Sequence, residues 1–378
     1  METDHRIYLG NSKDLSRLDD DAVELVVTSP PYPMIEMWDD LFSSLDPAVE
    51  TALDDGDGRR AFELMHETLA KTWDEVARVL VDGGIACINV GDATRKVDDS
   101  FRVYPNHARI IEYLDGLGFE PLPDILWRKP TNSAAKFMGS GMVPPNAYAT
   151  LEHEYVLVFR NGTDTRAFPS GSERRYNSAY FWEERNEWFS DVWADVTGTF
   201  QRLDHADGDL RDRSAAYPLE IPYRLVNMYS VYGDTVLDPF WGTGTTSLAA
   251  MIAGRNSVGY EIREPFAEVF DAAVSDVRNL ARDTVSKRIA RHEAFVQRRR
   301  ADGETFEYRA DHYDFPVTTK QERSIRLYTI DRVEPTADGY RVTHSPYDPS
   351  GATDGGDTGN SDEVADTGES TTPGSQPE

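Results

Sequence analysis

The strongest constraint on the fold is a strand-like segment that runs without interruption into a glycine-rich turn and an apolar helix. Residues 235–240 (TVLDPF) form the apolar segment, residues 241–246 (WGTGTT) form the turn, and residues 247–253 are apolar over a helical length. Glycine lets the backbone approach a ligand closely, so this order of elements is typical of a nucleotide-like cofactor site. A tight strand-to-helix connection with no ligand is the alternative.

The residues after the turn favour the cofactor site. Residues 256–262 (NSVGYEI) predict the next strand, near whose end stands Glu261, and a carboxylate there can accept ribose hydroxyls. Ser247 stands where the dinucleotide fingerprint has its third glycine, and no Gly-Lys pair follows as it would in a P-loop. The pattern therefore disfavours both a dinucleotide-dependent oxidoreductase and a P-loop enzyme.

A second motif, residues 28–32 (TSPPY), directly follows the apolar run 23–27. Each proline fixes its own φ and holds the residue before it extended, so the acceptor oxygens of Ser29 and Pro30 are presented rigidly. Two such acceptors suit the two hydrogens of an exocyclic amine, and Tyr32 offers a ring face on which a base can stack. The alternative is a plain structural stop at the end of a strand.

Together, the SPPY and DPFWGTGTT motifs resemble those of the DNA amino-methyltransferases, in the group whose catalytic half precedes its cofactor half. The resemblance covers most of residues 5–275, and residues 126–130 and 152–159 resemble the paired strands at the far edge of the family's sheet, beside the target base. In that family S-P-P-Y goes with methylation of cytosine N4, whereas D-P-P-Y is the usual adenine-N6 form, and this chain has Ser29. Residues 176–246 are also similar to archaeal N4-cytosine enzymes that modify the palindrome CTAG.

The resemblance implies an S-adenosylmethionine-dependent enzyme that methylates a cytosine flipped out of double-stranded DNA, with no covalent enzyme intermediate. It implies catalytic roles for Ser29, Pro30, Pro31 and Tyr32. It assigns the cofactor to Asn11, Asp238, Phe240, Gly242, Gly244, Thr245, Thr246 and Glu261, although the family often has an acidic residue where Asn11 stands. Adenine-N6 methylation by the same fold and a non-catalytic DNA-binding relative are the alternatives.

Apolar patterns predict an alternation of strands and helices. They indicate strands at 6–10, 23–28 and 85–90, and helices at 12–18, 61–80 and 105–117. This alternation predicts an α/β fold, and with the resemblance it predicts a doubly wound, Rossmann-like methyltransferase sheet, permuted so that the catalytic half comes first. Residues 82–84 are expected to end a helix, and the acidic residues 33–58 are expected to form a mobile flap over the pocket.

The chain divides by composition and motif into five parts. We expect a catalytic half (1–160), a target-recognition region (161–216), a cofactor-binding half with a long helix (217–300), a small β accessory element (301–345) and a disordered acidic tail (346–378). Arginines interleaved with aromatic residues in the second part suit base-edge contacts and stacking. The expected DNA contacts are Lys129, Arg174, Arg175, Tyr180, Arg185 and Trp188. A secondary aromatic core is the alternative for this region.

Charge is the feature least expected of a DNA-binding protein. The chain has 39 basic and 67 acidic residues, a net charge of −28, which opposes attraction to polyphosphate. Two explanations are a disordered acidic protein and a protein that avoids nucleic acid. A third is a halophilic origin, which is favoured because seven of the basic residues are lysine and the acidic residues are spread along the chain. In about 1 M salt the Debye length is about 3 Å, so direct contacts to bases would have to supply the affinity.

The cysteine content bounds the chemistry and the compartment. Cys87 is the single cysteine, so a disulfide framework and a cysteine metal site are excluded, and no metal is expected. It lies in a predicted strand and lacks the Pro-Cys context that enzymes of cytosine C5 methylation need. No signal peptide or long apolar span is recognisable, and a cytoplasmic protein with no membrane contact is expected. A restriction endonuclease acting on the same site is a candidate partner.

Overall fold

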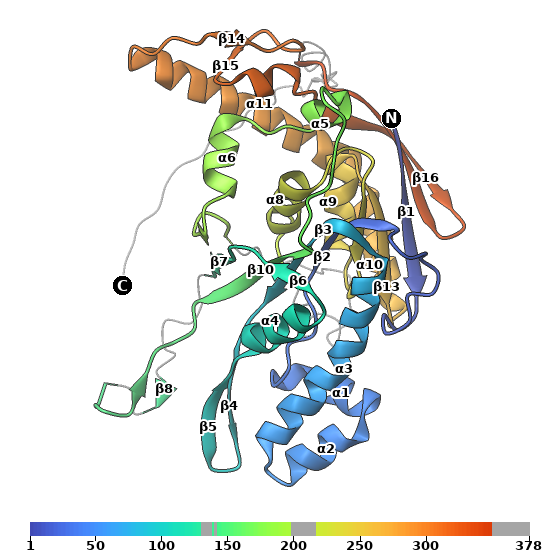
Figure 1. Cartoon of the computed structure of the whole chain (residues 1–378), viewed down its shortest axis with the longest axis vertical. Helices are drawn as coiled ribbons and strands as arrows, with labels where there is room; N and C mark the ends of the chain where they lie inside the picture. Colours follow the sequence, from blue (N-terminus) through green and yellow to red (C-terminus); the bar gives the residue numbers. More distant parts are fainter. Residues whose placement is uncertain (130–137, 140–141, 198–216, 350–378) are drawn as a thin grey trace, which may run out of the picture. The chain divides into compact units, whose positions relative to one another are not determined.

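The computed structural model describes residues 1–129, 138–139, 142–197 and 217–349. Within them the dominant feature is an eleven-stranded mixed sheet (Figure 1). Its centre consists of five parallel strands, in the spatial order β3 (Leu80–Val90), β2 (Val23–Thr28), β12 (Thr235–Asp238), β13 (Asn256–Glu261) and β1 (Glu2–Leu9). β2, β12 and β13 are buried along almost their whole length because both faces of a parallel sheet are covered, whereas β1 alternates between buried and more exposed residues.

Further strands, most of them paired antiparallel, extend both sides of this centre. Beyond β3 lie β10 (His153–Asn161), β7 (Ile125–Arg128) and β11 (Val192–Trp193), and β6 (Phe119–Pro121) also pairs with β10. Beyond β1 lie β17 (Gly339–Pro346) and β16 (Tyr328–Thr336). The pairing of β7 with β10 confirms the two edge strands that the sequence predicts at 126–130 and 152–159.

Helices cover both faces of the sheet, as alternate residues of β2 make clear. Val26 belongs to the apolar cluster under α3 (Gly58–Val79) and α4 (Asn106–Gly116), whereas Leu25 and Val27 belong to the cluster under α8 (Glu220–Tyr229) and α9 (Thr245–Ala253). Successive side chains of a strand point to opposite faces, so both clusters are built from one apolar run. The α/β prediction is confirmed, with a sheet that is mixed at both edges.

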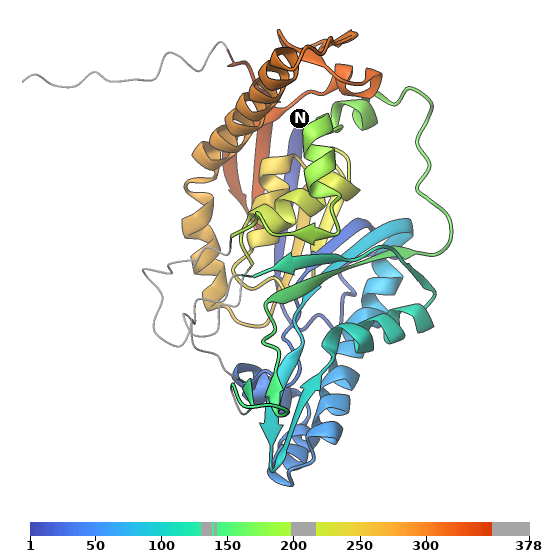
Figure 2. The same cartoon turned by 90° about the vertical axis from the view of Figure 1, so that its left-hand side faces the viewer.

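The remaining elements are short or peripheral, with one exception. The long helix α11 (Val277–Ala301) runs beside α9 and β16 (Figures 1 and 2). The others are α1 (Asp39–Leu45), α2 (Pro47–Asp54), α5 (Glu173–Asn177), α6 (Trp182–Trp188), α10 (Pro265–Val274), the 3-10 turns Glu36–Trp38 and Lys320–Ser324, and the short strands β4 (Ala93–Val97), β5 (Ser100–Tyr104), β8 (Met138–Gly139), β9 (Ala147–Tyr148), β14 (Tyr308–Arg309) and β15 (Pro316–Val317).

Two local predictions are wrong, and one segment has more regular structure than expected. Residues 12–18 form turns instead of a helix, because Asn11 and Asp14 accept backbone N–H groups two residues ahead of them. The segment expected to form a flap contains two helices, at residues 39–45 and 47–54, and Phe42 and Val49 are fully buried. Residues 82–84 lie within β3, so the helix before them ends at Val79.

The hairpin of β16 and β17 is part of the main sheet. From the sequence, residues 301–345 are expected to form a separate small β element. Residues 2–6 of β1 instead pair antiparallel with residues 339–343 of β17, and Figure 1 shows β1 and β16 on the same side of the molecule. This pairing is long-range, so local patterns within 301–345 could not reveal it.

A buried carboxylate joins the two motifs found in the sequence. Thr28, at the end of β2, donates its hydroxyl to Asp238 Oδ1 at 2.6 Å, and Thr246, in the first turn of α9, donates to Asp238 Oδ2 at 2.7 Å. Asp238 Oδ1 also accepts the backbone N–H of Phe240 at 3.1 Å. Burial raises the pKa of Asp238 to about 6, although these three hydrogen bonds favour the charged form.

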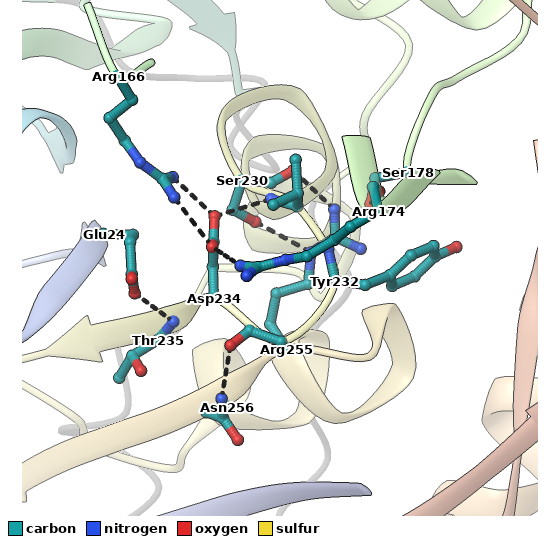
Figure 3. Close-up of polar contacts among 12 residues, drawn as sticks. Glu24, Arg166, Arg174, Ser178, Ser230, Tyr232, Asp234, Thr235, Arg255 and Asn256 are labelled. Carbon is teal, nitrogen blue, oxygen red and sulfur yellow. Dashed lines mark hydrogen bonds and ion pairs between the residues drawn. The ribbon is translucent and has the colours of Figure 1, made fainter. Parts of the chain in front are cut away.

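A second buried carboxylate, Asp234, fastens the segment after β10 to the start of β12 (Figure 3). Its side chain is fully buried and accepts two hydrogen bonds from Arg166, at 2.7 and 3.0 Å, and a further bond from Arg174. Its Oδ2 also accepts the backbone N–H of Val231 at 2.9 Å. Three donors from separate segments therefore meet on one carboxylate, which fixes where residues 161–180 lie.

Replacing Asp234 with alanine should destabilise the fold by about 3 kcal/mol, because a buried N–H and two guanidinium groups lose a charged acceptor. The free energy of unfolding in urea measures this. Asp99→Ala is the matched control: Asp99 is almost fully exposed and pairs only with Lys96 at 3.1 Å among the contacts described, so a loss below about 0.5 kcal/mol is expected. Equal losses in the two variants would contradict the anchoring role.

Asp238 should make stability depend on pH. Folding raises its pKa from 3.8 to about 6, so the group stabilises the fold fully below the lower value and loses this contribution as pH rises through the higher one. The unfolding free energy of the wild type, relative to Asp238→Asn, should therefore fall by about 1 kcal/mol between pH 5 and pH 8. Denaturation of both proteins across this range tests it, and a pH-independent difference would refute the shift.

Candidate active site

A concave site lies at the carboxyl ends of the central parallel strands. It is bordered by residues 10–12 after β1, 29–32 after β2, 238–243 after β12 and 260–263 at the end of β13. Ligands of open parallel sheets bind at this edge, where loops of adjacent strands diverge. The SPPY turn and the glycine-rich turn therefore line one pocket, although they are some two hundred positions apart in the sequence.

Helices complete the pocket: residues 33–58 were expected over it, whereas the contribution of α3 was not identified from the sequence. Trp38, Leu41, Phe42 and Leu45 line it from the segment around α1, and Thr68, Leu69 and Thr72 line it from α3. The periodicity of α3 predicts its buried face, but it does not reveal which part of that face borders a cavity. The presence of Trp38 and Phe42 in an acidic stretch was the available signal for the first group.

The SPPY turn holds a compact polar cluster. Ser29 Oγ lies 3.0 Å from the Tyr32 hydroxyl, which donates to Glu154 Oε2 at 3.0 Å. Burial, followed by the neighbouring Glu154 carboxylate, holds the pKa of Tyr32 well above its usual value, so this phenol is neutral at ordinary pH. Pro30 and Pro31 are buried and Ser29 is half-buried. All three residues line the pocket, so the turn packs against the protein and also faces the cavity.

Two residues of this cluster were missed as site residues. Glu154 lies on β10 and Asn89 on β3, and the Asn89 amide donates to Tyr32 at 2.8 Å and to Glu154 at 2.7 Å. Sequence reasoning placed the segment around Glu154 beside the target base but gave the residue no role. Asn89 stands inside an apolar strand, and a polar residue there was the only signal.

At the other end of the pocket, Glu261 organises the glycine turn. Its Oε2 accepts the backbone N–H of Gly242 at 2.9 Å, and its Oε1 accepts that of Arg263 at 2.8 Å. Burial raises its pKa, and the backbone donors act in the opposite direction. A carboxylate oxygen has further lone pairs, so Glu261 can still accept hydroxyls from a ligand. Phe240, Gly242, Thr245 and Asn11 also border the cavity.

Two of the expected cofactor residues serve mainly to support the pocket. Gly244 has a φ of +76°, and a Cβ there would lie 2.3 Å from the Phe270 ring and 2.7 Å from Trp241, so packing against these rings requires glycine. Thr246 donates to Asp238 and accepts from Tyr217 at 2.5 Å. Both residues hold the start of α9 behind the turn.

The expected DNA contacts fall into different environments. Lys129 lies beside the pocket, with its ammonium 2.8 Å from Glu154 Oε1. Arg174 is tied to Asp234, and Arg175 lies over the ring of Phe168. Arg185 is exposed on α6 above Phe189. Of the expected recognition region, residues 198–216 lie outside the described part of the chain.

Burial separates the aromatic residues of this region from one another. Tyr180 is half-buried, whereas Trp188 is 2% exposed and belongs to the main apolar cluster with the fully buried Trp193. For these two tryptophans the alternative of a secondary aromatic core fits better than a stacking surface. In the described ranges, no helix combines the length and the apolarity that crossing a membrane requires.

Comparisons with known proteins agree with this geometry. The sequence profile of the DNA methylase family of N6/N4 type matches residues 23–272. The type II methyltransferase M.MthZI of Methanothermobacter thermautotrophicus is 53% identical over 331 residues, 87% of this chain and 91% of its own length. M.MjaI of Methanocaldococcus jannaschii, also a type II methyltransferase, is 47% identical over 72% of this chain and 92% of its own.

Solved structures give the same result. TTHA0409 of Thermus thermophilus, described as a DNA modification methylase and solved with S-adenosyl-L-methionine, is 31% identical with a TM-score of 0.55, over 72% of this chain and 95% of its own. The profile spans more than half of the chain and includes both the SPPY turn and the glycine turn. The chain therefore belongs to the N6/N4 DNA methylase family.

Proposed function

We propose that this chain is a type II DNA methyltransferase that moves a methyl group from S-adenosylmethionine to the N4 amine of a flipped cytosine. The observation that carries the proposal is Ser29, at the first position of the SPPY turn, lining the same pocket as Glu261 and the glycine turn. A serine at this position goes with cytosine in the family that the sequence resembles. The target site we propose is a short palindrome, with CTAG as the candidate.

The pocket suits S-adenosylmethionine by the nature of its groups. When bound, this cofactor supplies an electrophilic methyl group on a sulfonium. Glu261 would accept its ribose hydroxyls, and Asn11 would contact the adenine end, as the resemblance implies. Asp238, Phe240, Gly242, Gly244, Thr245 and Thr246 would surround the methionine part or support the turn that does so. The T. thermophilus relative solved with S-adenosyl-L-methionine supports the choice of cofactor.

The chain's own residues would activate the amine. An amino group conjugated with its ring is a poor nucleophile, so the site must draw its lone pair out of conjugation. Ser29 Oγ and the Pro30 carbonyl would accept its two N–H groups, Pro31 would keep the turn rigid, and Tyr32 would stack on the ring. Positioning and hydrogen bonding then supply most of the rate enhancement, with no enzyme nucleophile.

Double-stranded DNA would bind across the pocket mouth. Flipping a base costs a few kcal/mol, which stacking on Tyr32 and contacts from the recognition region would offset. Lys129 and Arg185 have exposed positions from which they could reach DNA, and Arg174, Arg175, Tyr180 and Trp188 belong to the same proposed region of residues 161–216. We also propose that the catalytic half of the methyltransferase domain precedes its cofactor-binding half in the sequence. A net charge of −28 in a salt-rich cell would make direct contacts dominant, and a restriction endonuclease with the same target is the proposed partner.

Replacing Ser29 with alanine should lower the methyl transfer rate by about 100-fold or more, because one of the two acceptors for the amine is lost. Tyr32→Ala should have a similar effect through lost stacking. Cofactor affinity, measured by calorimetry, should stay within about twofold of wild type in both variants. Full activity in both variants would refute the assignment of the amine pocket.

The base and the target site are tested by the product. Mass spectrometry of nucleosides from treated DNA should show N4-methylcytosine. Methylome sequencing of a methylation-free host that expresses the chain should place it in CTAG. N6-methyladenine as the product would show that the target base is adenine and refute the proposed cytosine. Modification of another sequence would refute CTAG as the target site.

A further inference from the structure

Glu154 is at the centre of a hydrogen-bonded cluster under the amine pocket. Its side chain is 12% exposed, and both of its oxygens are occupied. Oε2 accepts from the Tyr32 hydroxyl at 3.0 Å and from the Asn89 amide at 2.7 Å, and Oε1 accepts from the Lys129 ammonium at 2.8 Å. The ion pair with Lys129 and the bonds to Tyr32 and Asn89 satisfy a carboxylate that would otherwise be costly to bury.

A carboxylate only accepts hydrogen bonds, so it determines the direction of every bond in the cluster. The one hydroxyl hydrogen of Tyr32 points to Glu154. The Tyr32 oxygen must then accept from its other neighbours, the Asn89 amide at 2.8 Å and Ser29 Oγ at 3.0 Å. The hydroxyl hydrogen of Ser29 is thereby directed to Tyr32, and the lone pairs of Ser29 are left for the pocket.

The Asn89 amide is consistent with this polarity. Its NH₂ group faces two acceptors, and turning the side chain over would place its carbonyl oxygen against the Glu154 carboxylate. The Asn89 carbonyl oxygen is buried and has no hydrogen-bond partner among the described residues. Leaving this acceptor unpaired costs free energy. The two hydrogen bonds that the NH₂ group donates offset this cost and hold the Asn89 side chain in its orientation.

We propose that Glu154 is a positioning residue that makes Ser29 a pure hydrogen-bond acceptor, through Tyr32. The pocket then accepts a base edge that carries an amine and rejects one that carries a carbonyl oxygen, such as uracil or thymine. The selection for an amine is therefore set on β10, outside the SPPY motif. This inference rests on the role given to Ser29 in the proposed function.

Glu154→Gln tests the direction of the bonds while it preserves the shape of the side chain. An amide has one acceptor oxygen, which Lys129 would claim, so its NH₂ group would face Tyr32. Tyr32 would then donate to Ser29, and Ser29 would present its hydrogen to the incoming amine. The single-turnover rate at saturating DNA and cofactor should fall about 100-fold, as when a preorganised hydrogen bond is removed from an active site.

The double variant Lys129→Met with Glu154→Gln provides the rescue. Without the ammonium, the glutamine oxygen can turn to Tyr32 and Asn89, which restores the direction of the chain. We expect its single-turnover rate to exceed that of Glu154→Gln by about tenfold or more, with Lys129→Met alone reporting any loss of DNA affinity. Glu152→Gln is the matched control, since Glu152 is an exposed residue beside the start of β10, and it should keep the wild-type rate.

The outcomes separate this inference from the proposed function. Activity in Ser29→Ala would refute the role of Ser29 and the inference with it. An inactive Ser29→Ala beside a fully active Glu154→Gln would overturn the inference alone. A double variant no faster than Glu154→Gln would also overturn it, because restoring the direction of the hydrogen bonds should restore the rate. Rescue with N6-methyladenine as product would support the inference and refute the proposed base.

Discussion

The structure depends on a buried hydrogen bond between Thr28 and Asp238, which are 210 residues apart in the sequence. It lies at the carboxyl ends of β2 and β12, which are adjacent and parallel in the sheet. Because the SPPY turn starts at the next residue after Thr28, and the glycine turn starts just after Asp238, this contact fixes the distance between the two halves of the pocket. A methyl transfer site requires that distance to be constant to within a fraction of an ångström.

Acceptor groups dominate the pocket and its support, and each is held by donors of the chain. Asp238 receives two hydroxyls and a backbone N–H, Glu261 receives backbone N–H groups, and Glu154 receives a phenol, an amide and an ammonium. Because a carboxylate can only accept, it determines which of its neighbours donate and so the direction of the hydrogen bonds around it. The acidity of this chain thus has a local use, apart from the solvated acidic surface expected in high salt.

Sequence patterns predicted β2 and β13 closely, whereas β1 and β3 begin four and five residues before their expected starts. β2 begins and ends at the predicted residues, and β13 ends one residue before the predicted end. Local rules failed where a side chain competes with the helix, as Asn11 and Asp14 do, and where Trp188 is buried by contacts from distant helices. Glu154 was placed near the site but given no role, since nothing in its own segment shows that Tyr32 and Asn89 lie against it.

The sequence by itself determined the chemistry that the chain can perform: an acceptor turn, a glycine turn before a helix, and an acidic residue at the end of the following strand, all of which follow from neighbours within a few positions. Only the tertiary structure decided that these groups face one cavity, that the β16 and β17 hairpin continues the main sheet, and which way the hydrogen bonds run from Glu154 to Ser29. Strand order and bond direction arise from contacts between residues far apart in the chain, and such contacts leave no periodic pattern in the sequence.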